Sequence, residues 1–175
     1  MSVDFRDCPL ISPQRQRLMD RLTELGLACR TVEHPPVFTV EDSGELYATI
    51  SGGHTKNLFL KDARGQLFLI VAHHGTRVDL KTLPPVIGSA RLSFGRAELL
   101  EEILGVKPGS VTAFALMNDS ERKVRVVLDQ NLMSFEIINL HPMENCATTS
   151  IAREDLLRFI RAAGHTPIIA ALTLD

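Results

Sequence analysis

The pattern of apolar and polar positions predicts one continuous domain, residues 1–175, in which helices and strands alternate. Ser12 and Pro13 open a segment where apolar residues recur at Leu18, Leu22 and Leu25, a spacing typical of an amphipathic helix. Ser caps free backbone N–H groups, Pro suits the first helical position, and the glycine after Leu25 suits a helix end. We therefore expect a first helix that packs on a sheet.

The strongest β-hairpin signal in the chain lies between residues 56 and 72. Residues 56–61 and 66–72 are apolar runs separated by Asp62-Ala63-Arg64-Gly65. Gly65 can adopt the positive φ that a tight turn needs. We expect two antiparallel strands joined at this turn.

The remaining pattern predicts more strands than a simple alternation of strand, helix and strand would give. We expect an α/β fold of the mixed α+β type, in which helices surround a mixed sheet. The further strands are expected over residues 28–33, 91–94, 111–116, 124–128, 135–140 and 168–172, with 111–116 and 124–128 turning through 118–123; the further helices over 39–50, 78–83, 97–104 and 153–163.

Composition and charge narrow the function. The chain is 45% hydrophobic and 23% charged, as is usual for a soluble globular domain, and with no Trp and one Tyr its core must be mainly aliphatic. Its 19 basic and 21 acidic residues leave a net charge of −2. A protein that coats nucleic acid is usually basic. Any contact with nucleic acid must therefore come from a local patch that docks on one part of an RNA.

The cysteines and the apolar runs bear on location. Cys8, Cys29 and Cys146 are odd in number and lack CxxC spacing, which is typical of reduced thiols. The first residues lack the apolar region of a signal peptide, and no apolar run approaches the roughly 18 residues of a membrane span. We expect a cytoplasmic protein with no membrane contact.

Familiar catalytic motifs are absent from the sequence. There is no G-x-S-x-G elbow for a serine nucleophile. His73 and His74 are adjacent, so on a strand they would point to opposite faces, and the other histidines lack an HExxH context. We expect chemistry without a metal or a cofactor.

Three segments differ from plain core and plain surface. Residues 51–62 run from a glycine-bearing turn into an apolar strand with Lys56 and Asn57 at the junction, where a cation and an amide can hold a phosphate or a carboxylate. Residues 105–114 hold glycines, including Gly109, whose backbone N–H groups can approach a ligand closely. Residues 139–149 form a loop with His141, which precedes a proline and is therefore held extended. Each has a plainer interpretation, respectively a solvated strand end, a helix cap with a turn, and a polar turn.

In their order, six stretches of this chain resemble the YbaK/prolyl-tRNA synthetase-associated editing family, and most of all its free-standing ProX-type (PrdX) deacylases of alanyl-tRNA(Pro). The likeness covers residues 12 to 175. The stretches are EHPPVFTVED (33–42), GGHTKNLFLKD (52–62), RVDLKTL (77–83), ARLSFG (90–95), GVKPGSVTAFALMND (105–119) and HPMENCATTSI (141–151).

The resemblance implies a barrel-like mixed sheet with packed helices and a site around Lys56. The GxxxP loop of the family corresponds to Gly109-Ser110-Val111-Thr112-Ala113, where Ala113 replaces the usual Pro and leaves the loop less stiff. His141 occupies the position of a site histidine in the ProX-type group. The Pro36-Val37-Phe38 stretch is our candidate for the wall of a small amino-acid pocket.

The implied activity is hydrolysis, in trans, of a wrongly attached amino acid from the acceptor end of tRNA, with Ala-tRNA(Pro) as the expected substrate. Lys56 would anchor the phosphate of the terminal adenosine, N–H groups near Gly109 would stabilise the oxyanion, and His141 and Asn57 would orient ligand or water. The terminal ribose hydroxyl would help to activate the water. Ser110, Thr112 and Ala113 would contact substrate.

Two alternatives stay open at this point. One is a deacylase of the same family that prefers cysteinyl- or seryl-tRNA, and the other is a non-catalytic module that binds aminoacyl-tRNA. Prolyl-tRNA synthetase is a second candidate partner. Two clusters of basic residues are candidates for the surface that docks tRNA. They are Arg122, Lys123 and Arg125, and Arg15, Arg17 and Arg21 of the first helix. Each cluster is also explained as ordinary solvated charge.

Overall fold

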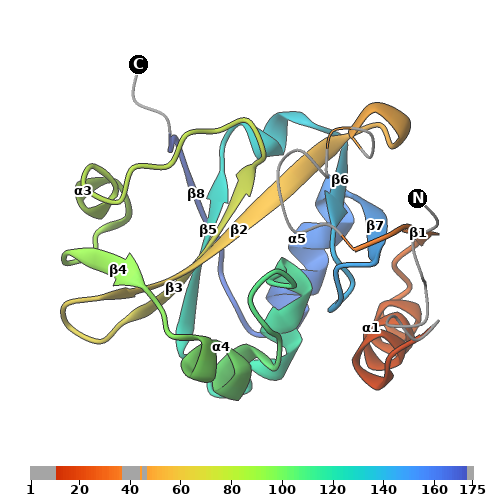
Figure 1. Ribbon diagram of the computed structural model, residues 1–175, viewed down its shortest axis with the longest axis horizontal. Helices are drawn as coiled ribbons and strands as arrows, with labels where there is room; N and C mark the ends of the chain where they lie inside the picture. Colours follow the sequence, from red (N-terminus) through yellow and green to blue (C-terminus); the bar gives the residue numbers. More distant parts are fainter. Residues whose placement is uncertain (1–10, 37–43, 45–46, 173–175) are drawn as a thin grey trace.

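A computed structural model describes residues 11–36, 44 and 47–172 of the chain (Figure 1). Eight strands form one mixed sheet, which confirms the expected architecture of a mixed sheet with helices around it. The strands are β1 (Cys29–Glu33), β2 (Gly53–Asp62), β3 (Leu67–His73), β4 (Leu92–Phe94), β5 (Val124–Asp129), β6 (Ile137–Leu140), β7 (Ala147–Ala152) and β8 (Ile168–Ala170). Their order is β1-β7-β6-β2-β3-β5-β8, and β4 pairs with β2 outside this path.

The long strand β2 belongs to both halves of the sheet. It pairs antiparallel with β3 in the expected hairpin, where Gly65 has φ 88°. At its other end it pairs in parallel with β6, with Gly53 opposite Ile138. A Cβ at Gly53 would come within 2.9 Å of the Phe135 ring, so only glycine permits this approach. The sequence pattern missed this part of β2, because Gly53 to Thr55 lack the apolar residues of the rest of the strand.

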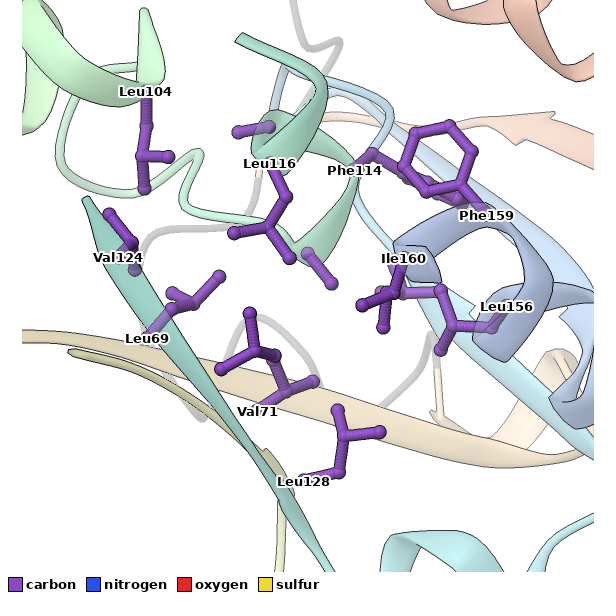
Figure 2. Close-up of a cluster of buried hydrophobic side chains, with 14 of the residues drawn as sticks. Leu69, Val71, Leu104, Phe114, Leu116, Val124, Leu128, Leu156, Phe159 and Ile160 are labelled. Atoms are coloured by element: carbon purple, nitrogen blue, oxygen red, sulfur yellow. The ribbon is translucent and has the colours of Figure 1, made fainter. Parts of the chain in front are cut away.

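Helices cover the first face of the sheet and enclose the larger core. They are α1 (Pro13–Glu24), α4 (Ala97–Leu104), α5 (Arg153–Ala162) and the 3-10 helix η2 (Ala113–Asn118). As Figure 2 shows, side chains from α4, η2 and α5 meet those of β3 and β5. Most of this core is aliphatic, as expected, and Phe114 and Phe159 form its edge-to-face aromatic pair with centroids 5.3 Å apart.

The second face carries a smaller core over only part of the sheet. The short helix α3 (Leu83–Ile87) packs its Leu83 and Ile87 against Leu60 and Phe68. Because successive strand residues alternate between faces, Leu60 and Phe68 belong to the face opposite Phe59 and Leu69. Beyond this core the second face carries polar residues such as His54 and Asn139 together with exposed apolar ones such as Ile137.

The structure corrects two of the expected elements. The helix expected over 78–83 begins only at Leu83, because Pro84 and Pro85 lack N–H groups and are tolerated only in a first turn. The strand expected over 111–116 is instead the helix η2, so the turn expected through 118–123 does not join two strands. Thr112 caps η2 by accepting a hydrogen bond from the Phe114 N–H at 3.3 Å. A short apolar run does not distinguish a buried strand from a buried helical turn.

The structure also adds a strand in a segment that was expected to be a loop. Within residues 139–149, the Ala147–Thr149 part belongs to β7, which pairs with β1 and β6. Thr31 and Thr149 face one another across β1 and β7, with hydroxyl oxygens 2.8 Å apart. The polar Thr149 can therefore lie in a buried strand, because its hydroxyl group bonds to that of Thr31 on the neighbouring strand.

The other expected elements are confirmed with shifts of a few residues at their ends, and η3 (Leu132–Ser134) is an additional short turn. Most of the helix expected over 39–50 lies outside the described residues; Tyr47 to Thr49 are helical. Cys29 is a free thiol, but Cys146 is disulfide-bonded, so the expectation of three reduced thiols is wrong. Among the described helices, none has the length and apolar character of a membrane span.

The packing of η2 makes a direct prediction for stability. Leu116 is fully buried between η2 and the sheet (Figure 2), so Leu116→Ala should lower the free energy of unfolding by about 2–5 kcal/mol, because apolar packing is removed and a cavity is left behind. Chemical denaturation measures the change. Ile11→Ala, at a 55% exposed position, is the matched control and should change stability little. Equal effects of the two substitutions would contradict the placement of η2 in the core.

Candidate active site

Lys56 lies on the second face of the sheet, at the border between its polar and apolar parts. It is opposite Ala72 of β3, and alternation along β2 places His54 on one side of it and Leu58 on the other. Burial lowers the pKa of the Lys56 ammonium group, and the negative charge of Asp129 opposes this shift. No carboxylate of the described residues lies within 4.0 Å of this ammonium group, so its hydrogen-bonding capacity is open to a ligand.

Asp129 ends β5 on the same face and is fully buried. Its carboxylate accepts hydrogen bonds from the His73 N–H and the Asn131 N–H, each at 3.0 Å, and from the Thr76 hydroxyl. These three donors hold the carboxylate in place, and its charge raises the pKa of Lys56 against the effect of burial.

An aromatic cluster extends along this part of the sheet. The Tyr47 ring lies 4.6 Å from that of His54 and 4.1 Å from that of His74, while His73 stacks on Phe135 at 5.0 Å. The expectation that His73 and His74 point to opposite faces is wrong, since β3 ends at His73 and the two rings lie 4.3 Å apart. Burial lowers the pKa of both His54 and His73 and so favours the neutral form of these two rings.

His141 follows β6 and is close to two other histidines. Burial lowers its pKa, the Ala147 carbonyl opposes this, and His34 and His54 lower the pKa further. His141 Nδ1 donates to the Ala147 carbonyl at 3.2 Å, which leaves Nε2 of the neutral ring as an acceptor. His34 is held in the same way, with Nδ1 on the Pro35 carbonyl at 2.7 Å and Nε2 on the Thr148 hydroxyl at 2.8 Å.

Arg15 of α1 ties together the two segments that hold these histidines. Its guanidinium group is buried and pairs with Glu33, which precedes His34, and with Glu144 in the loop after His141, at 3.0 Å. Within that loop Met143 has φ 70°, a conformation that side-chain-bearing residues seldom adopt. The expectation that Arg15 is a solvated residue is wrong, because its guanidinium group is buried and pairs with the carboxylates of Glu33 and Glu144.

The other basic residues proposed to dock tRNA are partly occupied by neighbours. Arg21 pairs with Glu24, Lys123 pairs with Glu121 at 2.8 Å, and Arg17 donates to Asn118. These contacts favour the plainer interpretation of both clusters, that of solvated surface charge.

The remaining predicted site residues lie elsewhere in the structure. Asn57 is opposite Val71 and so lies on the first face, where its Oδ1 is buried and has no hydrogen-bond partner among the described residues. Thr112 and Ala113 are fully buried, and Ala113 belongs to the larger core. The structure thus brings Lys56 and His141 to one region and places these three on the other side of the sheet.

Gly109 and Ser110 form an open turn. Gly109 has φ 91° and space around its α-carbon, and the Ser110 N–H donates to the Lys107 carbonyl at 3.0 Å. In the described structure no hydrogen bond joins this turn to Lys56 or His141. Pro36 is half-buried two residues after His34, and Val37 and Phe38 lie outside the described residues.

Sequence reasoning missed His34, His54, Asp129 and Thr148 as parts of this region. Signals in the sequence could have found two of them. His54 and Lys56 alternate along one strand, which places them on one face, and Asp129 is a charged residue at the end of an apolar strand. No three His, Cys, Asp or Glu side chains of the described residues are grouped so that they could hold a metal ion.

Comparison with known proteins gives a consistent family. The chain is 37% identical over 153 residues to the prolyl-tRNA editing protein ProX of Acetoanaerobium sticklandii, covering 87% of this chain and 93% of that one. It is 41% identical over 157 residues to the prolyl-tRNA synthetase associated domain-containing protein 1 of Danio rerio, covering 89% and 85%. A crystal structure described as a candidate trans-editing enzyme for prolyl-tRNA synthetase has the same fold, with a TM-score of 0.69 at 18% identity over 92% of this chain and 98% of that one.

The sequence model of one protein family matches residues 34–159, a span that begins at His34 and contains Lys56, Asp129 and His141. That family is described as the aminoacyl-tRNA editing domain. Together with relatives above 30% identity over most of both chains, the match settles the assignment. This chain belongs to the aminoacyl-tRNA editing domain family.

Proposed function

We propose that this chain is a trans-editing hydrolase that cleaves the ester of wrongly charged proline tRNA, with the alanyl ester as its substrate. The observation that carries the proposal is the half-buried Lys56 ammonium group, which has no ion-pair partner within 4.0 Å among the described residues. It lies near His54 and His73, whose pKa values burial lowers. The family of the chain and the names of its relatives support the substrate class.

In the proposed reaction, water attacks the carbonyl carbon of the ester that joins the amino acid to the terminal ribose. The bond between that carbon and the ribose oxygen breaks, a proton from the water goes to the ribose oxygen, and free amino acid leaves. Lys56 binds a phosphate of the terminal adenosine and so fixes the ester, since a charge-assisted hydrogen bond both holds and orients an anion. The neighbouring ribose hydroxyl assists the water, and the proposed oxyanion donor is the backbone N–H of Gly109.

His141 gives the site a neutral acceptor. Its Nε2 can accept a hydrogen bond from the ammonium group of the amino acid, because Nδ1 is fixed as a donor by the Ala147 carbonyl. A protonated His141 would repel that ammonium group, and burial disfavours the protonated form. The lowered pKa of His141 therefore suits a substrate that is itself a cation.

The need for such an enzyme follows from the size of the amino acids. A synthetase pocket that accepts proline cannot strongly reject the smaller alanine, since each missing methylene is worth only about 1–3 kcal/mol. A second site that admits alanine and excludes proline restores accuracy. We propose that Pro36 contributes to the wall of this small pocket, next to His34.

A basic groove offers a docking surface for the acceptor stem of the tRNA. It runs between the β2–β3 hairpin, α3, β4 and α4, and its cations are Lys61, Lys81, Arg91 and Arg96. All four are exposed, and none forms an ion pair with another described residue. Exposed cations without local partners are suited to phosphate contacts. Glu98 and Glu102 also line the groove, so the basic surface is local, as the net charge of −2 requires.

A panel of mischarged tRNAs tests the proposed function. Catalytic amounts of protein are added to proline tRNA carrying labelled alanine, cysteine, serine or proline, and loss of the ester is followed. We expect many turnovers on the alanyl ester and much slower loss of the prolyl ester. Preference for cysteine or serine would replace alanine within the same activity, whereas binding without turnover would identify a non-catalytic module.

The role of Lys56 is tested by two substitutions. Lys56→Ala removes a charge-assisted contact to phosphate and should reduce kcat/KM for deacylation by about 10- to 150-fold, the loss that corresponds to about 1.5–3 kcal/mol. Lys56→Arg retains the charge and should retain part of the activity. Circular dichroism and thermal unfolding serve as the control for folding. Full activity in Lys56→Ala would overturn the assignment.

The groove is tested by the salt dependence of tRNA binding. Removing both Arg91 and Arg96 should weaken binding of uncharged proline tRNA and reduce the slope of log Kd against log salt by about 1 for each phosphate that the variant no longer binds. Arg158→Ala is the matched control, because Arg158 is an exposed arginine of α5 outside the groove. If the double variant and the control have the same slope, the tRNA docks elsewhere.

A further inference from the structure

Asp129 and Lys56 form a pair of opposite charges across three adjacent strands. Lys56 of β2 is opposite Ala72 of β3, and β5 runs parallel to β3 on its other side, with Leu128 at the level of Val71. Asp129 is one residue further, on the face that Lys56 occupies. Along this row, the small side chain of Ala72 therefore lies between the two charged residues.

The hydrogen bonds of Asp129 satisfy its oxygens but do not neutralise its charge. All three donors are uncharged groups, namely two backbone N–H groups and the Thr76 hydroxyl. No arginine, lysine or histidine of the described residues lies within 4.0 Å of the carboxylate. A fully buried carboxylate is costly unless a nearby cation compensates it.

The titratable groups around Lys56 include only one carboxylate among the described residues that acts on its charge, that of Asp129. His54 on the same strand, His73 at the end of β3 and His141 after β6 are all shifted toward their neutral forms by burial, and His74 lies beside His73 in the adjoining turn. Among the described residues, Asp129 is the one carboxylate whose charge acts on Lys56. Burial favours loss of the Lys56 proton, and Asp129 opposes that loss.

We propose that Asp129 is the positioning residue of Lys56. The buried carboxylate of Asp129 keeps the Lys56 ammonium group charged and on the polar part of the second face, where it can bind a tRNA phosphate. This inference rests on the phosphate-binding role of Lys56 in the proposed function. The separation of the two groups matters, because a direct ion pair would occupy the ammonium group and compete with the phosphate. A carboxylate held at a distance by its own donors supplies the field and leaves the ammonium group free to bind.

The pair predicts how activity depends on pH. Lys56 binds phosphate only while it is protonated, so deacylation should decline as the pH rises through the Lys56 pKa. Asp129→Asn removes the negative charge and should lower that pKa, which moves the alkaline decline to lower pH. At a pH on this limb we expect kcat/KM to be reduced about three- to tenfold relative to the wild type.

A matched variant separates this role from a structural one. Thr76→Val removes a hydrogen bond to Asp129 and keeps its charge, so it should cost stability without moving the alkaline limb. The Lys56 pKa is measured directly by NMR titration of protein labelled with 13C at the lysine ε-carbons, with the Lys56→Arg spectrum giving the assignment. A folded Asp129→Asn protein with an unchanged Lys56 pKa would overturn the proposal.

A second variant does not depend on whether Asp129→Asn folds. Lys56→Met leaves the buried Asp129 carboxylate without the cation that compensates it, so this variant should lower the free energy of unfolding at neutral pH. Unchanged or higher stability of Lys56→Met in chemical denaturation would also reject the proposal. These measurements need no substrate, so a wild-type protein that fails to deacylate tRNA contradicts the proposed function alone.

Discussion

The two-sided pairing of β2 is the constraint on which the rest of the molecule depends. One strand completes a hairpin with β3 and also begins a parallel ladder with β6, and the second pairing is possible because Gly53 lets the strand approach Phe135. This pairing joins the half of the sheet that ends in His141 to the half that ends in Asp129. Lys56 lies between them because the two pairings meet at His54 and Thr55, just before it on β2.

The same strand explains why the site is polar on one side only. Asn57 and Phe59 lie on the face of the larger core, while His54 and Lys56 share a face with Leu58 and Leu60. Over Leu58 and Leu60 the helix α3 and its neighbours build an ordinary apolar core. Over His54 and Lys56 nothing apolar of comparable size is packed among the described residues. His54 donates to the Ile50 carbonyl and contacts the Tyr47 ring, while His74 Nδ1 is buried with no hydrogen-bond partner among the described residues. Such a surface is costly for folding, which is typical of a region kept for binding.

Much of the fold follows from the sequence, for reasons that particular elements make clear. The hairpin at Gly65 and the helices α1, α4 and α5 are set by local signals, namely a turn glycine, caps and apolar spacing. The strand β7 and the start of β2 are set by partners distant in the chain, which local patterns do not encode. The same division holds for the site. Lys56 and His141 could be identified through motif resemblance, whereas Asp129 and Arg15 act through contacts between segments more than 50 residues apart in one case and 129 in the other.

The buried Arg15 shows that the domain depends on a residue outside the span matched by the family model. The family match begins at His34, after both Arg15 and Glu33, yet Arg15 compensates Glu144 inside the matched span. A fragment trimmed to residues 34–159 would therefore keep every group proposed for catalysis but leave the half-buried Glu144 carboxylate, in the loop after His141, without the Arg15 guanidinium group. The first helix lies outside the matched span, yet its Arg15 links the segments that carry His34 and His141. A fragment should therefore include this helix if it is to keep the two histidines in their positions.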